Sequence, residues 1–188
     1  MDTAEIKRRM DSGEIYYENA EIYQEQVQYT DWIFQYNQLL PSKKTEKIAL
    51  LQKIFGSVGN DTTLMQPIHA NWGKNTFIGE RVYSNFNLTL VDDTKIIIGD
   101  DTMIGPNVTL IAGTHPLNPE LRLKNAQYNL PVTIGKNVWL GANVIVFPGV
   151  TIGDHSVIGA GSLVTKDVPE NVLAYGSPCK VIKKIENS

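Results

Sequence analysis

The 188-residue sequence has one cysteine, no long apolar run and no excess of basic residues. Because Cys179 is alone, an intrachain disulfide is excluded, which is typical of proteins from a reducing compartment. No stretch approaches the roughly 20 apolar residues of a membrane span, and the charged N-terminus lacks the apolar segment of a secretion signal. The formal charge of −3 gives no electrostatic reason to expect a nucleic acid or an anionic membrane as a partner. We therefore expect a cytoplasmic protein that binds neither.

An aliphatic residue, followed in most repeats by glycine, recurs every six positions in the C-terminal half of the chain. The repeated aliphatic positions are Ile134, Leu140, Val146, Ile152, Ile158 and Val164. A period of six is typical of a parallel β-helix, because each aliphatic side chain points into the coil and its small neighbour permits a tight turn. The sequence therefore predicts a mainly β fold built from hexapeptide repeats.

The same period extends towards the N-terminus. Ile98, Ile104 and Leu110 lie a whole number of sixes before Ile134. An earlier set keeps the period but lies two residues out of phase, and it consists of Trp72, Ile78, Ser84 and Leu90. We interpret residues 92–95, where the phase slips, as a widened corner between coils.

Residues 111–133 keep the register of the repeat while carrying glycine, several prolines and charged residues. Such a composition predicts a loop that leaves the coil and returns to it without disturbing the neighbouring repeats. Excursions from a rigid scaffold frequently carry functional residues. We therefore expect one protruding loop, and we expect function there.

Residues 1–60 are rich in Glu, Gln, Lys and Tyr, and we interpret them as a helical cap on the first coil. Residues 61–188 then form the β-helix domain, with 170–188 as its C-terminal segment. One helix is predicted between Ser42, a candidate N-cap, and Gly56, a candidate stop, and another precedes Pro41. Two roles fit residues 1–60: covering the first coil only, or covering it and also binding substrate.

The three histidines differ in context. His155 lies at a regular corner and fits a solvated turn residue, while His69 lies at the start of the β-helix and fits a structural role. His115 lies in the predicted loop, where the following Pro116 would restrict its movement. Because imidazole titrates near neutral pH, His115 is a candidate general base. Its spacing fits equally well with a loop histidine bonded to a carbonyl.

Several ordered motifs in the chain resemble a known family. They are the run 84–93, Gly105-Pro106-Asn107-Val108, Thr114-His115-Pro116, Asn137-Val138-Trp139, Val164-Thr165-Lys166-Asp167-Val168-Pro169 and Gly176-Ser177-Pro178-Cys179-Lys180. Together they resemble the galactoside and maltose O-acetyltransferases, bacterial enzymes of the hexapeptide-repeat acyltransferase superfamily, over nearly the whole chain. The resemblance implies a left-handed parallel β-helix that assembles as a homotrimer with active sites between subunits.

The resemblance also implies a reaction, the transfer of an acetyl group from acetyl-CoA to a hydroxyl of a sugar. At the position of the family's base, His115 would take the acceptor proton, and Asn85 would place the acceptor and stabilise developing charge. The only thiol, Cys179, resembles a structural position of the family in Gly-Ser-Pro-Cys, and no serine lies in a G-x-S-x-G context, so we expect direct transfer without an acyl-enzyme. No metal is required by this chemistry.

Further site residues follow from the same resemblance. The positions that match acceptor contacts are Asn71, Tyr83, Asn85, Asp93, Glu18 and Gln127. The positions that match coenzyme A contacts are Trp139, Ala142, Ala160, Thr165, Lys166, Lys180 and Lys183. Galactoside enzymes carry Met at the position of Gln127 and maltose-type enzymes carry Glu, so we expect Gln127 to line the acceptor pocket rather than to orient His115.

Three other functions stay open at this point. A xenobiotic acetyltransferase also uses a loop histidine, although such enzymes lack this kind of long helical cap. A γ-type carbonic anhydrase has the same coil and binds zinc through three histidines, which here are far apart in sequence. A non-catalytic β-helix scaffold has no need of His115, Asn85 and Trp139 together. Among sugars, the sequence leaves a galactoside, maltose or glucose acceptor open.

Overall fold

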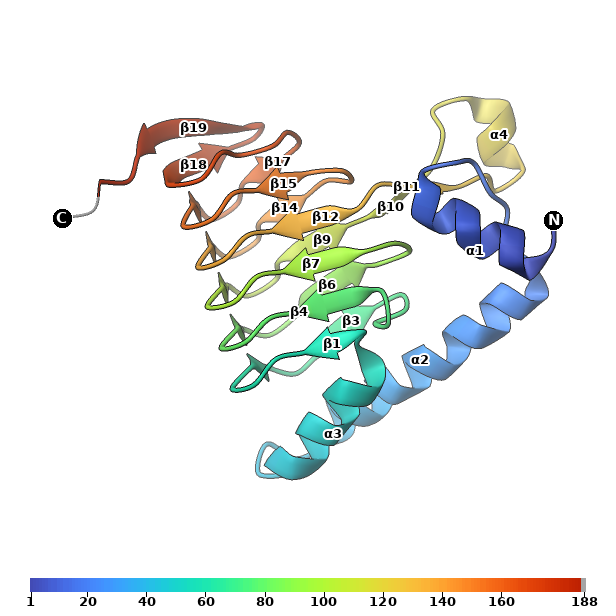
Figure 1. Ribbon diagram of the computed structural model, residues 1–188, viewed down its shortest axis with the longest axis horizontal. Coiled ribbons are helices and arrows are strands. Elements are labelled where there is room, and N and C mark those ends of the chain that lie inside the picture. The colour runs from blue at the N-terminus through green and yellow to red at the C-terminus, as the bar shows by residue number, and fades with distance from the viewer. Residues whose placement is uncertain (187–188) are drawn as a thin grey trace.

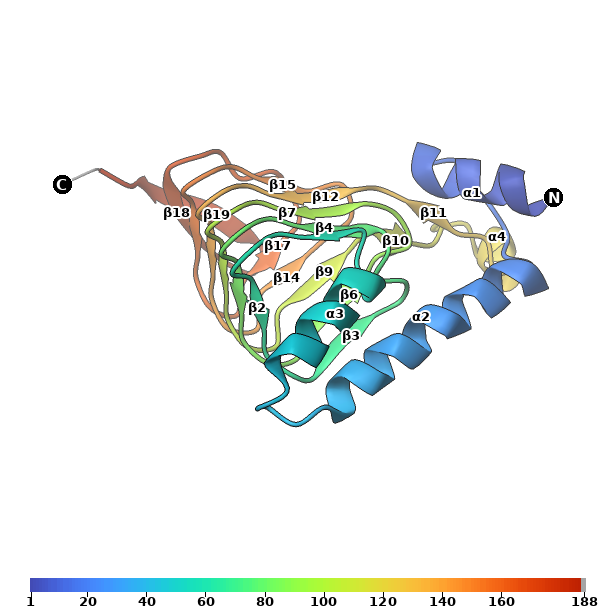
Figure 2. The same ribbon diagram turned by 60° about the horizontal axis from the view of Figure 1, so that its bottom comes forward.

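The computed structural model describes residues 1–186, so the last two residues of the predicted C-terminal segment 170–188 lie outside the described residues. Three helices come first, namely α1 (Thr3–Ser12), α2 (Ala20–Gln38) and α3 (Lys44–Ile54). Short strands follow and wind into a coil that is triangular in section (Figure 2). No helix of the described part of the chain is both long and apolar enough to cross a membrane.

Each face of the coil is a parallel sheet that receives one strand from each turn. The first face contains β1 (Ser57–Val58), β4 (Thr76–Ile78), β7 (Ile96–Ile98), β12 (Val132–Ile134) and β15 (Thr151–Ile152). The second contains β2 (Thr63–Leu64), β5 (Tyr83–Ser84), β8 (Met103–Ile104), β13 (Trp139–Leu140), β16 (Val157–Ile158), β18 (Val172–Gly176) and the antiparallel edge strand β19 (Cys179–Lys184). The third contains β3 (Ile68–Ala70), β6 (Leu88–Val91), β9 (Thr109–Ile111), β14 (Ile145–Val146) and β17 (Leu163–Val164).

The repeated aliphatic residues fill the inside of this coil. The six positions from Ile134 to Val164 all have 0% of their surface exposed. Removing each such side chain from water contributes about 1.5–3 kcal/mol to folding. The predicted fold class is thereby confirmed, a left-handed parallel β-helix of hexapeptide repeats with an N-terminal helical cap and one protruding loop.

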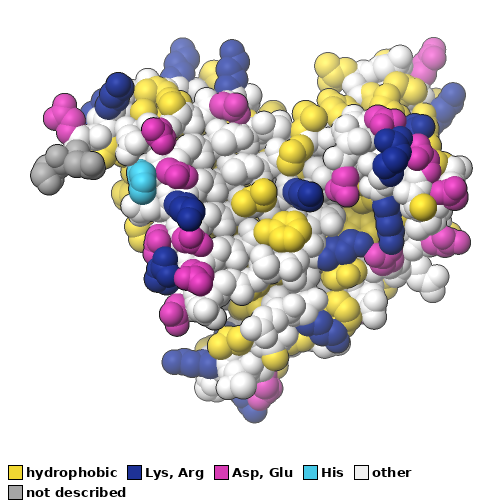
Figure 3. Space-filling view, in the orientation of Figure 1, with side chains coloured by type: hydrophobic (Ala, Val, Ile, Leu, Met, Phe, Trp, Pro, Cys, Tyr) yellow, Lys and Arg dark blue, Asp and Glu magenta, His cyan; other side chains and the backbone are white. Residues whose placement is uncertain are grey.

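Two of the three helices cover the open end of the first coil. In Figure 1, α3 lies below β1, and α2 runs from there towards α1 and ends beneath it. Ile33 and Tyr36 of α2, with Leu51 and Ile54 of α3, are buried and continue the core of the coil. On the face shown in Figure 3, acidic and basic side chains are interspersed over the helical end of the molecule.

The structure corrects two details of this end. Trp72 was expected to point into the coil, but it packs in a separate cluster with Ile6, Met10 and other residues of the helical segment. Lys43, not Ser42, precedes α3, and its side chain makes no capping bond. Near the end of α3, Gly56 allows a close backbone approach, because a Cβ there would lie 2.5 Å from the Lys74 carbonyl oxygen.

One excursion leaves the coil, between β9 and β12. It contains β10 (Gly113–Thr114), the short helix α4 (Pro119–Leu123) and β11 (Tyr128–Asn129), which pairs antiparallel with β10. The side chain of Asn118 caps α4, and Pro119 occupies its first turn. The first helix, α1, lies beside this loop in both ribbon views (Figures 1 and 2).

Stacked asparagines form a ladder at the corner between the second and third faces. Asn87, Asn107 and Asn143 all have left-handed backbone conformations, with φ of 62°, 58° and 58°. Asn87 Nδ2 donates to Asn107 Oδ1 at 2.9 Å, and Asn107 Nδ2 donates to Asn143 Oδ1 at 3.2 Å. Asparagine suits these corners because it tolerates positive φ and also bonds to the next turn.

We predict that Asn107→Ala destabilises the fold by about 1–2 kcal/mol, because alanine at positive φ is strained and both ladder bonds are lost. The matched control is Asn107→Gly, which loses the same bonds but tolerates the backbone conformation. The measurement is thermal unfolding of the three proteins at one concentration. A glycine variant as unstable as the alanine variant would contradict the backbone explanation.

Candidate functional site

The predicted site residues fall into two regions of one chain, at different corners of the coil. The first region, the loop cluster, lies where the third face turns into the first, and it contains Glu18, Asn71, Asp93, His115 and Gln127. The second region, the groove, runs along the second face to its corner with the third. It is lined by Tyr83, Asn85, Trp139, Ala142 and Ala160, together with neighbouring coil residues.

His115 follows β10 and is exposed at the start of the loop. Its Nδ1 lies 2.9 Å from the carbonyl oxygen of the buried Ala126. A carbonyl oxygen can only accept, so Nδ1 carries the hydrogen and Nε2 keeps a free lone pair. The same bond fixes the ring orientation, and a carbonyl-bonded histidine and a general base are therefore compatible descriptions of His115.

Asp93 is a buried carboxylate beneath the histidine loop. It accepts hydrogen bonds from Asn71 Nδ2 at 3.0 Å and 3.3 Å. Burial raises the pKa of the Asp93 carboxyl, while the Asn71 bond and a positive charge on His115 act in the opposite direction. Gly113 makes room for this arrangement, because a Cβ there would lie 1.9 Å from Asp93 Oδ2.

Glu18, from the segment between α1 and α2, joins the same cluster. Partial desolvation raises the pKa of its carboxyl, and the negative charge of Asp93 raises it further. The amide of Gln127 and the charge of His115 oppose this rise. The N-terminal segment therefore contributes a charged side chain to the region around His115.

The sequence did not indicate a role for Ala126, whose carbonyl holds His115, or for Tyr16, whose backbone pairs with Gln127, the residue after Ala126. The backbone N–H of Tyr16 donates to the Gln127 carbonyl at 2.9 Å, and the Gln127 N–H donates to the Tyr16 carbonyl at 3.0 Å. A backbone acceptor has no signal in the residue type of Ala126. Tyr16 is far from Gln127 in sequence, and nothing in the residues around it indicated this partner.

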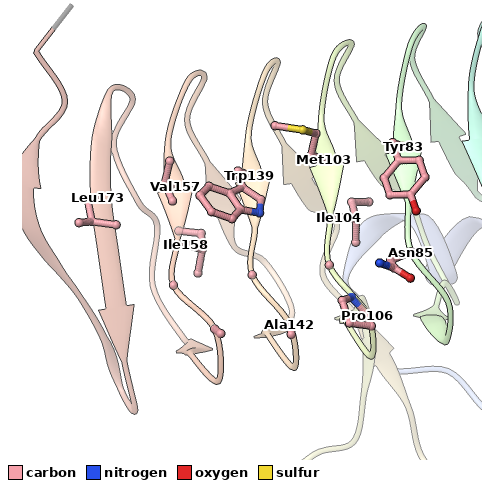
Figure 4. A pocket seen from close by; sticks show the side chains of 14 residues that line it. Tyr83, Asn85, Met103, Ile104, Pro106, Trp139, Ala142, Val157, Ile158 and Leu173 are labelled. Carbon is pink, nitrogen blue, oxygen red and sulfur yellow. The ribbon is translucent and has the colours of Figure 1, made fainter.

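The groove has a volume of about 580 Å³ and mixes one large aromatic residue with small ones. Trp139 projects from β13 with 52% of its surface exposed. Ala142 and Asn85 lie at the corner between the second and third faces. Tyr83 lies on the other side of Met103 from Trp139 (Figure 4). An elongated groove with an aromatic wall and small residues at its corner suits a long, flexible chain such as pantetheine.

The other predicted coenzyme A residues lie in two places. Lys183 of β19 lines a second hollow, which shares Val157 and Leu173 with the groove and therefore adjoins it. Lys180 lies at the start of the same strand. Thr165 and Lys166 follow β17 at the corner between the third and first faces, and they do not line the groove of their own chain.

The three histidines lie on different parts of the coil. His69 is exposed on β3, and His155 is exposed at a corner where its Nδ1 lies 3.2 Å from Asn137 Nδ2. Within residues 1–186, no group of three His, Cys, Asp or Glu side chains converges on a position for a metal ion.

A single chain does not bring Asn85 and His115 together. Asn85 lies where the second face turns into the third, and His115 lies beyond the far end of the third face. The whole width of that face therefore separates the groove from the loop cluster. Asn85 and His115, which the resemblance assigns to one site, thus lie at two different corners of the coil.

Two family models match the chain. The hexapeptide repeat of succinyl-transferase matches residues 95–115 and 131–166, which flank most of the excursion. The maltose acetyltransferase hexapeptide capping motif matches residues 9–59. The galactoside O-acetyltransferase of Lactococcus lactis subsp. lactis strain IL1403 is 47% identical over 100% of this chain and 92% of its own. The Escherichia coli K12 galactoside O-acetyltransferase is 47% identical over 82% of this chain and 76% of its own.

Solved structures give the same result. A galactoside acetyltransferase in complex with coenzyme A superposes with a TM-score of 0.93 at 41% identity, covering 99% of this chain and 92% of its own. A maltose O-acetyltransferase from Clostridium difficile 630 gives 0.94 at 41% identity, covering 97% and 98%. A hexapeptide-repeat acetyltransferase of Vibrio cholerae O1 biovar eltor, complexed with acetyl-CoA, gives 0.89 at 32% identity and covers both chains fully.

These relatives span nearly the whole chain, including the helical cap, the coil and the excursion that carries His115. The chain therefore belongs to the galactoside and maltose O-acetyltransferase family of hexapeptide-repeat acyltransferases.

Proposed function

We propose that the protein transfers an acetyl group from acetyl-CoA to a hydroxyl of a galactoside, maltose or glucose unit, with His115 as general base. The observation that carries this proposal is the bond from His115 Nδ1 to the Ala126 carbonyl, which leaves Nε2 free, while the charges of His115, Glu18 and Asp93 act on one another. The family names of the relatives support a sugar acceptor, and their complexes with coenzyme A and acetyl-CoA support the donor.

Nε2 of His115 takes the proton of the sugar hydroxyl as its oxygen attacks the carbonyl carbon of the thioester. The tetrahedral intermediate then collapses, the carbon–sulfur bond breaks, and the imidazolium returns the proton to the departing thiolate. Asp93 and Glu18 stabilise the transient imidazolium by their charge. Asn71 and Gln127 add amide groups that can bond to the hydroxyls of a sugar.

The negative oxygen of the intermediate needs a donor that is aimed at it in advance. No backbone acceptor within residues 1–186 takes the N–H of Ala142, which lies at the corner of the groove. We assign this N–H to the oxyanion, and we assign Asn85, at the same corner, to placement of the acceptor. A backbone donor does not depend on the side chain at 142.

The separation of the groove from the loop cluster supports a homotrimer whose sites lie between neighbours. In such an assembly the groove of one chain faces the His115 loop of the next. Leu117 and Leu123 of the loop are 91% and 87% exposed in the single chain, which suits a surface that a neighbour covers. We place this enzyme in the cytoplasm, where its free Cys179 stays reduced.

His115→Ala should lower kcat by at least ~100-fold, the usual effect of removing a general base, while acetyl-CoA binding stays nearly unchanged. Release of free thiol over a panel of galactosides, maltose and glucose measures turnover, and calorimetry measures coenzyme binding. The control is His155→Ala, which removes an exposed corner imidazole and should keep normal turnover. Near-normal turnover of His115→Ala would refute the assignment, as would an equal loss in the control.

A shared site can be tested by mixing two inactive variants. Ala160→Trp should block the groove without disturbing the core, because Ala160 is exposed at its corner. When it is co-expressed with His115→Ala, random assembly leaves about a quarter of the composite sites with both parts intact, so activity should return to that level. A mixture as inactive as its two components would show that each site lies within one chain.

Gln127→Met should change acceptor KM and the ranking of acceptors more than kcat, because it alters the pocket and leaves the Ala126 carbonyl bond in place. Gln127→Glu adds a third carboxylate near His115, so the acidic limb of the pH profile of kcat/KM should move to higher pH. If Gln127→Met abolished turnover on every acceptor while coenzyme A still bound, Gln127 would instead orient the base.

A further inference from the structure

The buried side of the loop cluster contains a hydroxyl that the reaction itself does not need. We propose that the phenolic hydroxyl of Tyr16 is a positioning group of the acceptor site, which holds the Gln127 amide so that its NH2 group faces Glu18. The inference rests on the proposed function, because it gives the Tyr16 hydroxyl a role in acceptor selection. It assigns no chemical step to Tyr16.

The geometry around Tyr16 fixes the direction of its hydrogen bonds. Its side chain is fully buried, and its hydroxyl lies 3.2 Å from Gln127 Oε1 and 3.2 Å from Asn129 Oδ1. Both partners are carbonyl oxygens, so the phenol donates to the two of them through one shared hydrogen. Burial, helped by the charge of Asp93, raises the pKa of the phenol, which therefore stays protonated as a donor.

Asn129 prevents this arrangement from shifting. It is 1% exposed, and its Nδ2 donates to the carbonyl oxygens of Met10 and Asp93 at 3.1 Å each. The amide orientation of Asn129 is set by these two bonds, which leaves Oδ1 for Tyr16. One asparagine thus joins the end of α1, the coil corner and the returning limb of the loop.

The bond from Tyr16 sets the orientation of the Gln127 side-chain amide. When its Oε1 is engaged by Tyr16, its NH2 group is left to interact with the Glu18 carboxylate, whose pKa the Gln127 side chain lowers. An amide can accept from a phenol and donate to a carboxylate at the same time, which neither a thioether nor a second carboxylate can do. Tyr16, Gln127 and Glu18 therefore form a relay from the buried interior to the acceptor pocket.

Besides Tyr16 itself, the groups that interact electrostatically with Glu18 are Asp93, His115 and Gln127. Among them, only Gln127 is held in place by Tyr16. Without the phenolic hydroxyl the amide is free to rotate, and the Glu18 carboxylate loses a fixed donor. An acceptor hydroxyl that bonds to Glu18 then meets a less defined partner, so the loss should affect acceptor KM more than kcat.

The test is a double-mutant cycle of Tyr16→Phe and Gln127→Met, because the phenylalanine variant keeps the ring and the backbone pairing. With Gln127 intact, Tyr16→Phe should raise acceptor KM by roughly 3- to 10-fold, the range expected for one hydrogen bond. When Tyr16→Phe is added to the Gln127→Met variant, its effect should be less than roughly 2-fold. The matched control is Tyr36→Phe, which removes another buried hydroxyl, bonded to the Leu64 carbonyl, and should leave KM unchanged.

A second readout does not depend on activity. The pKa of Glu18 can be followed by NMR titration of protein labelled with ¹³C at glutamate carboxyl groups. It should be higher in Tyr16→Phe than in the unaltered protein. In the Gln127→Met background, adding Tyr16→Phe should leave it unchanged. Equal effects of Tyr16→Phe in both backgrounds, or no movement of either readout, would overturn the relay. If the Glu18 titration moves as expected while the unaltered enzyme acetylates no sugar, the relay stands and the proposed acceptor class fails.

Discussion

Parallel backbone pairing between successive turns is the constraint on which the rest of this structure depends. β12 pairs with β7 in register, with Val132 opposite Ile96 and Ile134 opposite Ile98. The chain between them includes the entire excursion, yet the ladder continues as if the excursion were absent. Because Leu130 N–H returns to the Ala112 carbonyl at 2.9 Å, both ends of the loop are fixed on one rigid corner. The coil therefore determines the backbone position of His115, close to Gly113 and the buried Asp93.

The N-terminal segment has a second role beyond covering the first coil. While α2 and α3 continue the core, α1 and the residues after it contact the loop on the side away from β10. Tyr16 pairs with Gln127 on one side of the returning limb, and β10 pairs with it on the other. The limb that follows Ala126 is thus held between β10 on one side and a single antiparallel bridge to Tyr16 on the other. Of the two interpretations that the sequence left open, this arrangement supports capping combined with a contribution to the site.

The fold was predictable because one physical pattern, an inward aliphatic residue every six positions, is local and repeats. Aromatic Trp72 shared that period but packs against the helical segment, because the period alone does not distinguish the inside of the coil from a corner that this segment covers. The contact between Tyr16 and Gln127 joins residues 111 apart in sequence, and nothing local to either residue specifies it. Family resemblance supplied the residues of the groove and the loop cluster and implied sites between subunits, and the structure adds that Asn85 and His115 lie at different corners of one chain.

The electrostatics of the loop cluster explain why a neutral amide suits position 127. The charge of Asp93 already raises the cost of ionising Glu18 in a partly desolvated corner, and each carboxylate has one amide donor beside it, Asn71 or Gln127. The Nδ1 atom of His115 is occupied by a backbone carbonyl, so neither carboxylate bonds to the ring there. The electrostatic attraction between these carboxylates and the ring is strongest when the ring becomes an imidazolium. In the proposed reaction, a base arranged in this way would be oriented by the backbone and supported by the carboxylates only as its positive charge develops.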